Sequence, residues 1–166
     1  MTVRAGLVLD RRRVALLDEG LPCLPHHHEA QGLPLADATL LIERVRASAE
    51  RHARDCLDAL AREHAPHAIA LRACPPLPET IAERLASYRA QNVADTAMYR
   101  TALAGAAAQR GWRVTWYEPK RVDAEAARAL GLASLEPFLE RAGAALGRPW
   151  TKDHRMAMAA AIAATA

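Results

Sequence analysis

The stretch Gly111–Ala129, GWRVTWYEPKRVDAEAARA, carries the clearest information about the fold. Its first part, Trp112–Tyr117, has the aromatic and β-branched content that is typical of a strand. Pro119 has no backbone N–H and ends the strand, and the helix-favouring residues that follow stop at Gly131. Because an Ala-rich segment precedes the strand, the order helix, strand, turn, helix predicts a mixed or parallel sheet.

The bulk composition sets broad limits on what the protein does. The chain has 166 residues, enough for one domain with a substantial core, and a formal net charge of +3 that permits binding to an anionic partner without requiring it. Cys23, Cys56 and Cys74 form no C-x-x-C pair, which indicates reduced thiols instead of a zinc ribbon or a disulfide framework. No stretch has the pattern of a signal peptide or a membrane span, so we expect a cytoplasmic protein with no membrane partner.

The first half of the chain predicts strands followed by one long helix. Two apolar runs, Val3–Leu9 and Val14–Leu17, indicate a hairpin, and a third short strand fits near Leu21–Leu24. Apolar residues then recur at spacings of three and four over Ala36–His64, which predicts a helix. Ala68–Ala73 is a short apolar run between prolines and reads as a buried strand.

The second half predicts alternating helices and strands. Glu79 begins a helical segment that we expect to break at Gln91-Asn92, and Val93–Arg110 continues as an Ala-rich helix. After the strand that contains Trp112, two more helices follow, the last with Thr151 as its N-cap. The whole of residues 1–166 is therefore predicted to form a single α/β domain.

Three adjacent histidines, His26, His27 and His28, lie in a Pro- and Gly-punctuated segment. They cannot all face one ion from a regular helix or strand, so a metal site would need a wrapped loop and a distant partner. A solvated loop is the favoured interpretation, and a metal site is the alternative.

Three stretches resemble the RuvC-type Holliday-junction resolvases of the ribonuclease H-like superfamily. The segment EHAPHAIALRACPP (63–76) is similar to the helix, proline and buried strand of that family, and YRTALAGAAAQRGWRVTWYEPKRV (99–122) is similar to its Ala/Gly-rich helix and following strand. The segment DHRMAMAAAIA (153–163) is similar to the closing helix. The resemblance implies an α/β, ribonuclease H-like fold with a mixed five-stranded sheet flanked by helices.

The resemblance also implies a chemistry, phosphodiester hydrolysis by two Mg²⁺ or Mn²⁺ ions about 4 Å apart. Asp10, Asp153 and His154 match the positions of metal ligands and catalytic residues, and Glu79 is a further catalytic candidate. Arg72 stands where the family has a glutamate, and a guanidinium cannot bind Mg²⁺. The catalytic set implied by the resemblance is therefore incomplete.

Three functions follow as hypotheses. The first is a RuvC-like protein that binds nucleic acid, with structured or branched DNA favoured over RNA. Its phosphate contacts would come from six basic side chains: Arg11, Arg12, Arg13, Lys120, Arg121 and Lys152. The second is an active Mg²⁺-dependent endonuclease with a rebuilt site, and the third is a protein-interaction module in which the Ala-rich helices form a homodimer.

Overall fold

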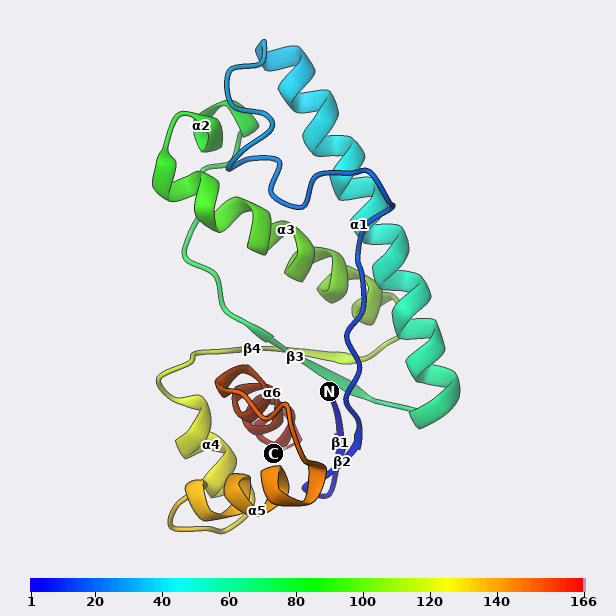
Figure 1. The fold of residues 1–166 in the computed structure, drawn as a ribbon, viewed down its shortest axis with the longest axis vertical. Coiled ribbons are helices and arrows are strands. Elements are labelled where there is room, and N and C mark those ends of the chain that lie inside the picture. Colours follow the sequence, from blue (N-terminus) through cyan, green and yellow to red (C-terminus); the bar gives the residue numbers. More distant parts are fainter. Residues whose placement is uncertain (166) are drawn as a thin grey trace. The chain divides into compact units, whose positions relative to one another are not determined.

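The structure is a computed structural model that describes residues 1–165 and comprises two compact units (Figure 1). Unit 1 contains Met1–Arg13, Leu60–Ala73 and the chain from Gly111 onward. Unit 2 contains Val14–Ala59 and Cys74–Arg110. Each unit is therefore assembled from segments that are distant in the sequence.

A short hairpin begins unit 1. Strand β1 (Thr2–Arg4) pairs antiparallel with β2 (Leu7–Asp10), and the two residues between them, Ala5 and Gly6, both have positive φ angles. Positive φ at both central residues is the requirement of a tight primed turn, whose twist matches that of the strands. The run predicted as the first strand, Val3–Leu9, thus forms both strands of the hairpin, together with one residue on either side, and the predicted second strand, 14–17, is not a strand.

The second sheet of unit 1 has two parallel strands. Strand β3 (Ala68–Arg72) pairs with β4 (Arg113–Tyr117), and Arg72 lies opposite Tyr117. Both strands were predicted, but the mixed five-stranded, ribonuclease H-like sheet is wrong. Among residues 1–165 there are two separate sheets of two strands each, and 21–24 forms no third strand. The described residues are helix-rich, and their strands are short and pair only two by two.

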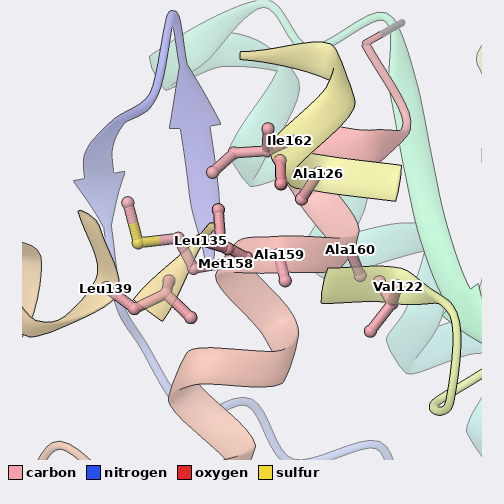
Figure 2. Packing of buried hydrophobic residues seen from close by; sticks show 9 residues of the cluster. Val122, Ala126, Leu135, Leu139, Met158, Ala159, Ala160 and Ile162 are labelled. Atoms are coloured by element: carbon pink, nitrogen blue, oxygen red, sulfur yellow. The ribbon is translucent and has the colours of Figure 1, made fainter. Parts of the chain in front are cut away.

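The core of unit 1 is built around the last helix. Helix α6 (Lys152–Ala163) contacts α4 (Val122–Ala129), β1 and β3. Its Ala159 and Ala160 are small enough for close approach, and Met158 and Ile162 fill the space beside them (Figure 2). Leu135 and Leu139 add side chains from the start of α5 (Glu136–Leu146).

Unit 2 is made of helices and a long segment without regular structure. Helix α1 (Leu35–His64) confirms the predicted long helix, and its residues up to Ala59 belong to unit 2. A short α2 (Ile81–Leu85) precedes α3 (Tyr88–Gln109). The predicted break at Gln91-Asn92 is wrong, because α3 runs through it.

The actual break before α3 is explained by helix capping. Thr80 caps α2, and Ser87 accepts a hydrogen bond from the N–H of Ala90 as the N-cap of α3. Gln91 is buried and donates to the carbonyl of Leu85, at the end of α2. Gln91, one of the two residues at which a break was predicted, therefore stabilises the junction of the two helices.

Candidate functional site

The carboxylate of Asp10 lies at the end of β2 and is paired with a basic neighbour. Nε of Arg12 donates to Oδ2 of Asp10 at 2.9 Å, and the same guanidinium pairs with Glu63 near the end of α1. The hydrogen bond to Glu63, followed by that to Asp10, raises the pKa of Arg12, and the bond from Arg12 lowers the pKa of Glu63. Asp10 therefore forms part of a carboxylate–guanidinium–carboxylate bridge.

Asp153 and His154 lie in the first turn of α6. Nδ1 of His154 accepts the backbone N–H of Thr151 at 3.1 Å, which satisfies a donor at the start of the helix. The His154 ring stacks on Trp150 with 6.1 Å between ring centroids. The predicted N-cap position of Thr151 is confirmed, while His154 is occupied in capping and stacking.

Glu79 belongs to unit 2, whereas Asp10, Asp153 and His154 belong to unit 1. Within residues 1–165, no three His, Cys, Asp or Glu side chains are placed so that they could hold a metal ion. The predicted Mg²⁺ or Mn²⁺ cofactor therefore stays a prediction. Glu63, which was not predicted, is the acidic side chain that shares Arg12 with Asp10.

The predicted phosphate-binding residues fall into two groups. Arg11, Arg12 and Arg121 have partners within unit 1. Arg11 donates to the carbonyl of Pro149 at 2.8 Å and to that of Gly147 at 3.3 Å, and Nε of Arg121 is 3.4 Å from a Glu125 carboxylate oxygen. The two bonds from Arg11 hold the chain after β2 beside the loop that precedes α6.

The second group is free to meet a ligand. Arg13, Lys120 and Lys152 are exposed, and none of them has an ion pair or a side-chain hydrogen bond in the described part of the chain. Lys152 is the first residue of α6, and Lys120 lies between β4 and α4. Half of the predicted set is therefore available for phosphate.

The two units differ in charge. Unit 1 has 14 Arg and Lys residues against eight Asp and Glu residues, a net formal charge of +6. Unit 2 has eight Arg and Lys residues against 11 Asp and Glu residues, a net formal charge of −3. The net charge of the whole chain, +3, hides this division.

The histidine run is more structured than a solvated loop. His26 is 2% exposed, and its Nδ1 lies 2.7 Å from Oδ1 of Asp95, which is 1% exposed on α3. The backbone N–H groups of His26 and His27 donate to the two Asp95 oxygens at 3.0 and 3.1 Å. Sequence reasoning missed Asp95, although it is the only acidic residue of the Ala-rich α3.

Comparisons with known proteins found no relative of this chain. No protein-family model, no curated protein and no solved structure matches the chain. In residues 1–165, no helix combines the length and the apolar character that crossing a membrane requires.

Proposed function

We propose that unit 1 binds nucleic acid through the phosphate backbone, without reading the base sequence. The observation that carries the proposal is the division of charge, +6 in unit 1 against −3 in unit 2. A concentration of Lys and Arg in one part of a chain is the electrostatic signature of phosphate binding. A uniformly mixed surface would give no such contrast.

Arg13, Lys120 and Lys152 are the proposed contacts, because each is exposed and unpaired within residues 1–165. Phosphate binding at these side chains breaks no internal ion pair. Arg11 and Arg12 serve as positioning residues instead, since they fasten the segment before Arg13 to the 147–149 loop and to Glu63.

Two of the proposed contacts, Lys120 and Lys152, lie at different levels along the axis of α6. Lys152 begins the helix, and Val122, two residues after Lys120, packs near Ala160 (Figure 2). About 12 Å of helix axis separates positions 152 and 160 at 1.5 Å per residue. Phosphates follow one another at about 3.4 Å along the axis of one strand, so the two lysines meet different phosphates.

Binding is supported ahead of cleavage. Asp10 shares its carboxylate with Arg12, His154 is bonded to the start of α6, and Glu79 is part of the other unit. The proposal therefore assigns no catalytic step to these residues. Structured DNA is the first ligand class to test.

The experiment is a salt titration of binding to fluorescent DNA. Three probes of equal length, a duplex, a four-way junction and a single-stranded RNA, separate branched DNA from other polyanions. The triple variant Arg13→Gln, Lys120→Gln, Lys152→Gln should lower the slope of log K against log salt by about 2.7, at about 0.9 per lost phosphate contact with B-DNA.

The matched control is Arg44→Gln, Arg54→Gln, Arg89→Gln, which removes the same charge from exposed positions of unit 2. This control should leave the slope unchanged. A native slope near zero would rule out phosphate binding. An equal loss in both triple variants would mean that net charge alone, and not unit 1, drives the binding.

A further inference from the structure

The parallel sheet of unit 1, strands β3 and β4, has two different faces. Successive side chains of a strand point to opposite faces, and residues opposite each other on paired strands point to the same face. Ala70 and Tyr117 pack against the apolar cluster around α6, so they mark the face that is turned to the core of unit 1 (Figure 1). Trp116 and Leu71, which are opposite each other, therefore lie on the other face.

Trp116 reaches solvent on a face whose other residues are buried or partly buried. Leu71 is 7% exposed, and Ile69 and Val114 are partly buried, whereas Trp116 is 46% exposed. Among the described residues of unit 1, Trp116 is the only aromatic one that belongs to the exposed large hydrophobic side chains. Part of its surface is thus held by the protein, and the rest is open to a ligand.

The charge around this ring favours an anionic ligand. Trp116 belongs to unit 1, whose net formal charge is +6, and Lys120, a proposed phosphate contact, follows four residues later. Four residues of chain span at most about 14 Å, so both lie in one short segment. Glu118 lies between them and repels a phosphate, which is therefore expected at Lys120. A ligand with a flat apolar part and a phosphate, such as a nucleotide, suits both side chains.

A nucleic acid can use an exposed indole ring where its bases are unpaired. In a duplex the neighbouring base pairs cover both faces of each base, whereas a base of a single strand can be splayed out and stacked on an aromatic side chain. Such stacking tolerates any base, because every base has a π face. It is therefore compatible with binding that does not read the base sequence.

We propose that unit 1 binds single-stranded nucleic acid, with a base stacked on Trp116 and the adjoining phosphate at Lys120. The inference rests on the phosphate binding proposed above and adds the class of ligand to it. The basic side chains supply the affinity that depends on salt, and Trp116 supplies the preference for an unpaired strand over a duplex.

The test measures binding of the full chain to fluorescent oligo-dT and to a duplex of equal length over a range of salt concentrations. The native chain should prefer oligo-dT. Trp116→Leu, which keeps an apolar side chain but has no π face, should weaken oligo-dT binding about 5- to 150-fold, the effect of losing one base–aromatic stack. The slope of log K against log salt should stay unchanged, because no charge is removed.

Two further variants control for a general disturbance of the fold. Trp116→Phe keeps an aromatic ring and should recover most of the affinity that Trp116→Leu loses. Tyr88→Leu removes a 71% exposed ring from unit 2 and should leave oligo-dT affinity unchanged.

Equal oligo-dT affinity in the native chain and in Trp116→Leu, with a salt slope that persists, would overturn the stacking and leave the phosphate binding intact. Absence of salt-dependent binding to either probe would overturn both. Equal losses for oligo-dT and duplex in Trp116→Leu would show that the ring does not contact an unpaired base. Loss of a dimer in size-exclusion chromatography of Trp116→Leu would assign the ring to a contact between copies. Either of these results would also overturn the stacking.

Discussion

In the described residues, unit 1 buries apolar side chains and has a net positive charge, whereas unit 2 adds buried polar side chains to its apolar core and has an excess of acids. In the described residues, the four buried polar side chains all belong to unit 2: His26, Ser48, Gln91 and Asp95. The core of unit 1 consists of large and small apolar residues such as Leu139, Met158 and Ala159. The two units thus obtain a fixed interior by different means.

The difference follows from what each unit has to hold in place. In unit 1 helices and strands pack face to face, and the fit of their apolar side chains defines the positions of these elements. In unit 2 residues 14–34 have no helix or strand, so their backbone groups need partners from side chains. Side chains of α3 and α1 supply those partners through hydrogen bonds. Unit 2 therefore contains buried polar side chains.

The largest expected effect comes from Asp95→Ala. It leaves the N–H groups of His26 and His27 and the His26 ring without their acceptor. Each buried polar group that loses its partner costs about 1–3 kcal/mol, so the free energy of unfolding should fall by about 3 kcal/mol or more. Urea denaturation followed by circular dichroism measures it.

Leu103→Ala, at a partly buried apolar position of the same helix, is the control for the loss of a side chain that makes no polar contact with residues 23–31. A loss below about 1 kcal/mol for Asp95→Ala would contradict the polar account of unit 2, because that is the value of an ordinary solvent-competed hydrogen bond.

Two glycine-to-alanine substitutions, one in each unit, compare a tightly packed helix position with an open one. A Cβ on Gly143 in α5 would clash with the indole ring of Trp150, so Gly143→Ala should destabilise unit 1 by about 1–3 kcal/mol through overpacking. Gly105 in α3 has nothing within 4 Å of such a Cβ. Gly105→Ala should therefore stabilise the chain by about 0.5–1 kcal/mol, because alanine favours a helix interior.

Thermal unfolding of the two variants in parallel gives the answer. Opposite signs support tight apolar packing around Trp150. If both substitutions stabilise the protein, the contact between Gly143 and Trp150 does not constrain unit 1.

Local patterns predicted the elements that depend on local physics. The spacing of apolar residues predicted α1, the apolar run between prolines predicted β3, and the aromatic and β-branched run before Pro119 predicted β4. The hairpin was misplaced because Val3–Leu9 reads as one apolar run, although Gly6 was the available turn signal. The five-stranded sheet failed because strand pairing is long-range, and the resemblance supplied an order of elements without their partners.

The candidate site residues also divide into those that the local sequence could identify and those that depend on long-range contacts. Exposure of Lys120 and Lys152 follows from their charge and position in the chain, so sequence reasoning could find them. The partners of His26 and Arg12 could not be found, because Asp95 is 69 positions from His26 and Glu63 is 51 from Arg12. A lone acidic residue in an Ala-rich helix was the one local sign of the buried contact.

The smallest expected effect concerns Asp18, where unit 2 uses the same kind of contact at its surface. Hydrogen bonds from Arg51, His52 and Ser48 hold the pKa of Asp18 well below its ordinary value of 3.8, with the bond from Arg51 the largest cause. A lowered folded-state pKa contributes stability that is present above 3.8 and is lost as the pH falls towards the folded-state value. Asp18→Asn should therefore be less stable than the native chain at neutral pH and should approach it below 3.8.

Urea midpoints measured across that range test the expectation, with Glu19→Gln as a neighbouring exposed control. The effect is small because Asp18 is 46% exposed and water competes for its partners, unlike those of Asp95. A difference between Asp18→Asn and the native chain that stays constant with pH would show that the contact contributes by packing alone. The distinction between a buried and an exposed carboxylate within unit 2 would then rest on Asp95 only.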